Sequence, residues 1–129
     1  MVRFAGVLID TKRAVVVRGD SKGTEVLHID SALDDRVRTA NGDGGDEAGA
    51  DTQREGLRVM QLRRYFDRIV DAIRGCNRFI ILGPDDMKVQ LRKHLDRIPD
   101  QAHRIVAVKT VKKMSDNQLV EEVTSFFRR

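Results

Sequence analysis

A short apolar run followed by an amphipathic stretch, between Arg78 and Leu95, constrains the fold of this chain most. Four apolar residues, Phe79 to Leu82, come directly before Gly83-Pro84, and such a short run beside a breaker predicts a buried strand. Because the run is apolar on both faces, it belongs in the middle of a sheet that helices cover. Pro84 fits the first turn of a helix. The apolar stripe of this helix recurs at every fourth residue, at Met87, Leu91 and Leu95.

Three strands are expected before this unit and one after it. Apolar residues at Val2 to Ile9, Ala14 to Val17 and Thr24 to Asp30 are separated by short polar turns, which predicts three strands, the first two paired as a hairpin. Arg104 to Val111 predicts a fifth strand, which follows the break at Pro99.

One more helix is expected before the central unit and one after it. From Leu57 to Arg74 the apolar residues share one stripe at helical spacing, and Gly75 fits the end of that helix. Ser115 and Gln118 have the spacing of a capping box, which predicts the start of a last helix. The stripe of the longer helix is expected to be Val59, Leu62, Phe66, Ile69, Val70 and Ile73.

Together these elements predict an α/β fold. Strands that are separated by helices need right-handed crossovers and form parallel pairs. We therefore expect a five-stranded mixed sheet in the ribonuclease H-like order 3-2-1-4-5, with helices on both faces. A chain of 129 residues is long enough for one such domain, and we expect residues 1–129 to form it.

The segment from about residue 34 to residue 55 has almost no apolar side chains and is rich in Gly and Asp. Such a composition cannot bury a core, so we expect a flexible acidic loop. A loop of this length in a small domain is either functional or disordered.

Charge is unevenly distributed along the chain. The net charge is +4 overall, but residues 1–56 hold 8 Lys/Arg and 11 Asp/Glu, whereas residues 57–129 hold 16 and 9. A basic half indicates an anionic partner such as RNA. Within the long helix, Arg64 and Arg68 lie three or four residues from Asp67 and Asp71, so we expect these charges to pair with one another.

Several function classes are not expected. The single cysteine, Cys76, excludes an internal disulfide, fits a reducing compartment and is expected to be buried. No apolar run is long enough to cross a membrane and no signal peptide is recognisable, so we expect a soluble cytoplasmic protein. No His or Cys has metal-ligand spacing, and we expect neither a metal nor a cofactor.

Three sequence features resemble the middle domain of archaeal and eukaryotic class I release factors and of Pelota, and also bacterial release-factor-like proteins. Gly44-Gly45-Asp46 stands where release factors carry Gly-Gly-Gln. An Arg-containing helix, Arg54 to Arg74, follows this loop. Leu82 to Lys88 is similar to the strand-Gly-Pro-x-x-x-Lys turn of the family. The resemblance covers nearly the whole chain and implies the fold expected above.

The resemblance implies a translation-associated domain that binds the ribosome or tRNA. In release factors the Gln enters the peptidyl transferase centre and helps to place the hydrolytic water. Asp46 replaces it here, so catalysis by this loop is not expected, as in Pelota, which rescues ribosomes without that chemistry. The candidate RNA contacts are the basic residues Arg58, Lys88, Arg92, Lys109, Lys112 and Lys113.

Two alternatives remain open from the residues. A metal-dependent nuclease with a ribonuclease H-like sheet would need carboxylates that converge on Mg²⁺, and Asp10, Asp85 and Asp86 follow two strands expected to be neighbours. An anion or nucleotide site at the helix opening after Gly83 is the weaker alternative, because the two aspartates there oppose a phosphate.

Overall fold

The computed structural model describes residues 3–33 and 48–128. The strands and helices follow in the order β1 Phe4–Ile9, β2 Arg13–Gly19, β3 Thr24–Asp30, α2 Ala48–Ala72, β4 Arg78–Gly83, α3 Met87–Asp96, α4 Pro99–Ala102, β5 Ile105–Thr110 and α5 Asp116–Phe127.

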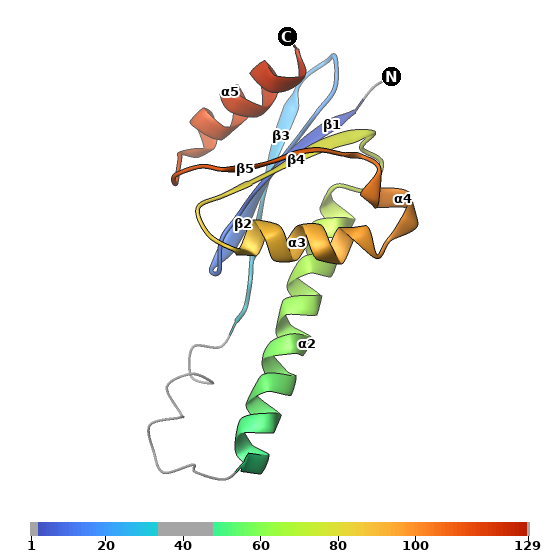
Figure 1. The fold of residues 1–129 in the computed structure, drawn as a ribbon. Coiled ribbons are helices and arrows are strands. Elements are labelled where there is room, and N and C mark those ends of the chain that lie inside the picture. The colour runs from blue at the N-terminus through green and yellow to red at the C-terminus, as the bar shows by residue number, and fades with distance from the viewer. Residues whose placement is uncertain (1–2, 34–47, 129) are drawn as a thin grey trace.

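The five strands form one mixed sheet in the order β3-β2-β1-β4-β5, which confirms the predicted order. β1 pairs antiparallel with β2, and β2 pairs antiparallel with β3. β4 pairs parallel with both β1 and β5, as the crossover connections require. In consequence the C-terminal ends of β1, β3, β4 and β5 all lie at the same end of the sheet, and α2 extends past this end (Figure 1).

Helices cover both faces of the sheet, also as predicted (Figure 1). Side chains alternate along each strand, so neighbouring residues of β4 enter different cores. Ile81 is 0% exposed and lies with residues of α2 and α3, whereas Ile80 lies with Leu119 and Val123 of α5. Two apolar layers therefore enclose the sheet, and β4 is buried on both sides.

Two glycines allow the closest approaches in these layers. A side chain at Gly6 would lie 2.2 Å from Val123, so the missing side chain lets α5 lie directly on β1. A side chain at Gly83 would lie 2.5 Å from the carbonyl oxygen of Ile9, where the ends of β1 and β4 come together. Both glycines are needed for close approach of neighbouring elements.

The long helix differs from its prediction at its beginning. α2 begins at Ala48 and not at Leu57, so residues 48–55, which were expected to belong to the loop, are helical. The rest of the expected loop, residues 34–47, lies outside the described residues. Val59 was predicted to be buried but is 53% exposed, while Tyr65 is fully buried.

The other helix ends match their sequence signals in two of three cases. Gly75 has a φ of 86°, as expected for the residue that ends α2. Ser115 and Gln118 form the predicted capping box at α5. Pro84, however, does not open α3, which begins at Met87; the backbone N–H of Met87 donates to the Asp85 carboxylate at 2.9 Å. No helix within residues 3–33 and 48–128 has the length and apolar character of a membrane span.

Candidate nucleic-acid interface

Basic side chains line a hollow at the end of the sheet where β1 and β3 finish. The turn between β1 and β2 contributes Lys12 and Arg13, and Lys113 comes from the segment after β5. The hollow has a volume of about 440 Å³, and the residues after β3 form another wall. This arrangement brings cations together from two separate parts of the sequence.

The two carboxylates in this hollow are engaged by their own turns. Asp10 accepts hydrogen bonds from the backbone N–H groups of Lys12 and Arg13, at 2.8 and 2.9 Å. Asp30 accepts one from Ala32 at 2.8 Å, which holds Ala32 at its unusual φ of 53°. These acids shape the two turns, while the side chains of Lys12 and Arg13 remain exposed to solvent.

A second hollow, with a volume of about 460 Å³, continues this surface onto α2. Arg64 and Arg68 line it together with Ser31, which also lines the first hollow, so the two hollows adjoin. We call the cations of both hollows, Lys12, Arg13, Arg64, Arg68 and Lys113, the basic band.

The predicted pairing of charges within α2 is wrong. Oδ1 of Asp67 lies 3.0 Å from Nε2 of His94 on α3. Asp71 accepts a hydrogen bond from Arg74 at 2.8 Å. Within the part of the chain that the structure describes, the two carboxylates therefore have other partners, and Arg64 and Arg68 are exposed on the helix surface.

The residues predicted to contact RNA are spread over the molecule. Lys113 belongs to the basic band, and its neighbour in the sequence, Lys112, is also exposed after β5. The ammonium of Lys109 lies 4.9 Å from the ring centroid of Phe126, under α5. Arg92 is exposed on α3, with Nε 4.0 Å from the Asp96 carboxylate.

Two other predicted contacts and the loop motif lie elsewhere. Lys88 is only 9% exposed, and its Nζ donates to the carbonyl oxygen of Asp85 at 2.6 Å. Arg58 is half-buried on α2, nearer than Arg64 to the beginning of that helix. Gly44, Gly45 and Asp46 lie outside the described residues. Thus Lys113 is the predicted residue that belongs to the band, and Lys12, Arg13, Arg64 and Arg68 were missed.

The carboxylates proposed for a nuclease do not converge. Asp10 is engaged in its turn, Asp85 accepts from Met87, and Asp86 accepts from the side-chain amide of Gln90 at 3.3 Å. Among the described residues, no three His, Cys, Asp or Glu side chains are placed to hold a metal ion. The alternative of a metal-dependent nuclease at these three aspartates is therefore contradicted. Asp85 and Asp86 occupy the opening of α3, so that opening gains no support as an anion site.

The fold is similar to solved structures of two translation-linked proteins. No family model matches the sequence, and no curated protein matches it. The Pelota protein of Thermoplasma acidophilum is 18% identical over 95% of this chain, with a TM-score of 0.58. The Pelota of Archaeoglobus fulgidus is 15% identical over the same share, also with a TM-score of 0.58.

The archaeal translation termination factor aRF1 is 8% identical over 98% of the chain, with a TM-score of 0.55. This chain covers only 32% and 31% of the two Pelota chains and 39% of aRF1. Since identity is low, the likeness concerns the fold. The chain thus has the α/β fold that Pelota and aRF1 contain in about a third of their length, consistent with their middle domain.

Proposed function

We propose that this chain is a translation-associated, release-factor-like domain that binds the ribosome or tRNA through the basic band and does not catalyse peptide release. The observation that carries the proposal is the fold likeness to Pelota and to a translation termination factor over nearly the whole chain. A protein with this role would work in the cytoplasm.

The chemistry of the basic band suits a phosphate backbone. Arg64 and Arg68 offer planar guanidinium groups that can bind phosphate through two parallel hydrogen bonds, and Lys12 and Lys113 add point charges. Cations from α2, from the β1–β2 turn and from the segment after β5 would contact several phosphates at once. Lys112, Arg58, Lys109 and Arg92 are proposed as further contacts elsewhere on the molecule.

Lys88 is the exception among the predicted contacts. Its ammonium already donates to the carbonyl oxygen of Asp85, and Lys88 is nearly buried. A phosphate contact would require Lys88 to give up this hydrogen bond. We therefore propose that Lys88 stabilises the turn before α3 and does not contact phosphate.

The absence of peptide release is proposed from the sequence of the Gly-Gly-Asp motif. Asp46 places a carboxylate where the resemblance implies a neutral amide, and Asp43 and Glu47 stand beside it. Negative charges would be repelled by ribosomal RNA phosphates at close range. Added to stalled ribosomes that carry peptidyl-tRNA, the protein should give only background hydrolysis. Release that is lost in Asp46→Ala would show that an aspartate can serve in this position.

Ribosome co-sedimentation tests the binding. Purified protein should pellet with ribosomes at low salt, and the bound fraction should fall steeply as salt rises, because phosphate contacts release counterions. Electrophoretic mobility of tRNA under the same conditions separates the two partners. If neither ribosomes nor tRNA retain the protein at low salt, the proposed function is wrong.

A further inference from the structure

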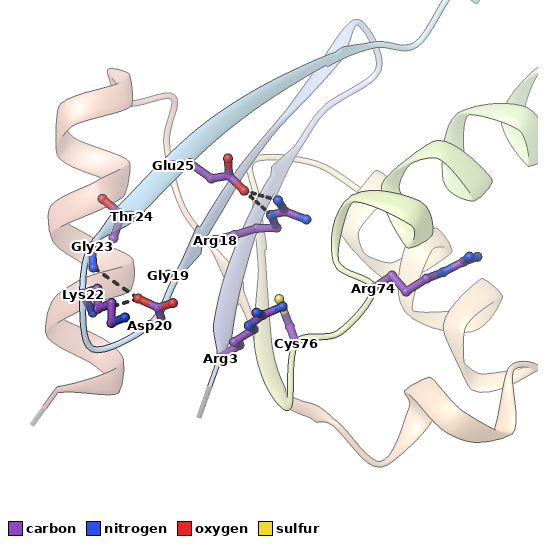
Figure 2. A pocket seen from close by; sticks show the side chains of 10 residues that line it. All are labelled: Arg3, Arg18, Gly19, Asp20, Lys22, Gly23, Thr24, Glu25, Arg74 and Cys76. Carbon is purple, nitrogen blue, oxygen red and sulfur yellow. Dashed lines mark hydrogen bonds and ion pairs between the residues drawn. The ribbon is translucent and has the colours of Figure 1, made fainter. Parts of the chain in front are cut away.

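A second cavity lies at the opposite end of the sheet from the basic band. Its volume is about 420 Å³, and it is bounded by the beginning of β1, the β2–β3 turn and the end of α2. Figure 2 shows its charged side chains, and those that line it are Arg3, Arg18, Asp20, Lys22, Glu25 and Arg74. β1 begins beside this cavity and ends beside the basic band, so the length of the strand separates the two sites.

The two carboxylates of this cavity are already bound within the protein. Asp20 accepts hydrogen bonds from the backbone N–H groups of Lys22 and Gly23, at 2.8 and 3.2 Å. The bond from Lys22 is the main cause that holds the pKa of Asp20 below its ordinary value. Glu25 is bound by the guanidinium of Arg18. Glu25 is therefore satisfied by Arg18, whereas the charges of Arg3 and Lys22 also help to lower the pKa of Asp20.

Arg18 is held in place, which prepares it to bind an anion. Its Nε and Nη2 donate to Glu25, and its Nη1 donates to the carbonyl oxygen of Ala72 at 3.1 Å, at the end of α2. These bonds use only part of its N–H donors. A guanidinium that is fixed in this way loses little conformational entropy when a ligand binds.

Arg3 and Lys22 supply positive charge that no carboxylate in the described chain neutralises through a direct ion pair. A Cβ at Gly75 would lie 3.7 Å from Nη1 of Arg3, so this guanidinium lies over the turn that ends α2. At Cys76, burial raises the thiol pKa, and the charges of Arg18, Arg3 and Arg104 oppose that rise. Three arginine side chains therefore lie close enough to this thiol to act on it.

We propose that this cavity binds a phosphomonoester dianion, such as the terminal phosphate of a nucleotide or of an RNA 5′ end. Arg74 is paired with Asp71, so the cations that face a ligand in this cavity are Arg3, Arg18 and Lys22. A phosphomonoester carries a charge of about −1.5 to −2 at pH 7 and has three terminal acceptor oxygens, one for each of these cations, whereas a diester has only two. The volume also leaves room for the attached sugar.

Chemical-shift titration followed by amide NMR tests this site, with AMP as the probe and adenosine as its control. AMP should shift the amides of Gly19, Lys22, Gly23 and Cys76 to saturation, and adenosine should not. A 5′-phosphorylated RNA oligonucleotide and its 5′-hydroxyl counterpart form a second pair of probes. A comparison of the Kd values for AMP and for the phosphorylated RNA shows whether the site prefers a nucleotide or an RNA 5′ end.

Matched variants separate a defined site from diffuse attraction. Arg3→Gln and Lys22→Gln, both at exposed positions, should each raise the Kd for AMP by about tenfold, as expected for the loss of one charged hydrogen bond. Arg97→Gln removes the same charge from the exposed end of α3 and should leave the Kd unchanged. Equal binding of AMP and adenosine, or equal weakening in all three variants, would overturn the proposal. Ribosome binding through the basic band would be unaffected by either result.

Discussion

The hydroxyl of Tyr65 donates a hydrogen bond to the backbone carbonyl oxygen of Asp10 at a distance of 2.9 Å. Tyr65 is fully buried, and burial raises its pKa, so the hydroxyl keeps its proton and remains a donor. The bond joins α2 to the turn after β1. Because Arg64 adjoins Tyr65 and Lys12 belongs to that turn, this contact fixes the two halves of the basic band relative to each other.

Substitutions of Tyr65 should show how much this hydrogen bond contributes to the free energy of unfolding. Tyr65→Phe keeps the ring, which stacks on Phe66 with centroids 5.9 Å apart, and removes only the donor. The free energy of unfolding in urea should fall by about 1 kcal/mol. Tyr65→Leu also removes the ring and should cost about 3 kcal/mol. A Tyr65→Phe variant as stable as the parent would mean that water replaces the hydroxyl at Asp10.

The central strand should not tolerate a charge. Ile81→Asp would place a carboxylate at a fully buried position with no partner, and we expect the protein not to fold, since the cost of several kcal/mol approaches the whole stability of a small domain. Val106→Asp on the edge strand β5 is the control, because Val106 is 47% exposed. Circular dichroism melting should show no transition for the first variant and a nearly normal one for the second.

Apolar runs and capping signals, together with the rule for crossover connections, were sufficient to predict the order of the sheet. The short apolar run Phe79 to Leu82 beside Gly83-Pro84 predicted the buried strand β4, and the capping box at Ser115 predicted the start of α5. The beginning of α2 was missed because residues 48–55 carry no apolar stripe. Tyr65 was missed because its burial depends on a distant carbonyl oxygen that accepts its hydroxyl.

The close approach of α5 to the sheet gives a double-mutant test. Gly6→Ala would bring a methyl group within 2.2 Å of Val123 and should destabilise the protein by about 1 to 3 kcal/mol. Val123→Ala removes the opposing methyl groups, so the double variant should be more stable than the sum of the two single effects indicates. Gly23→Ala is the control, since a Cβ there meets nothing within 4 Å. Strict additivity would contradict the predicted clash.

Alkaline pH should destabilise the folded protein through the buried thiol of Cys76. Burial raises the pKa of Cys76 above its ordinary value of 9.0, so the unfolded chain loses this proton at a lower pH than the folded protein. The thiol's contribution to stability is therefore complete below pH 9.0 and is lost as the pH rises above it. Urea unfolding from pH 7 to pH 10 should show a smaller fall in Cys76→Ala than in the parent. Parallel pH profiles would show that the thiol does not contribute.

The candidate interface was less predictable than the fold. Lys112 and Lys113 could be placed beside the sheet edge because they follow a strand. Arg64 and Arg68 were missed because helical spacing favours local pairs, whereas Asp67 contacts His94, which is 27 residues later. A contact between two helices decides which charges remain available, and local spacing does not contain that information.

The salt dependence of ribosome binding in two matched variants tests the basic band most directly. Arg64→Gln combined with Lys113→Gln removes one Arg and one Lys from the band; Lys93→Gln combined with Arg97→Gln removes the same charges from the exposed surface at the end of α3. The slope of log affinity against log salt should become shallower by roughly one per lost contact in the first variant, with lower affinity, and should stay at the parent value in the second. Equal changes in both variants would contradict binding through the basic band.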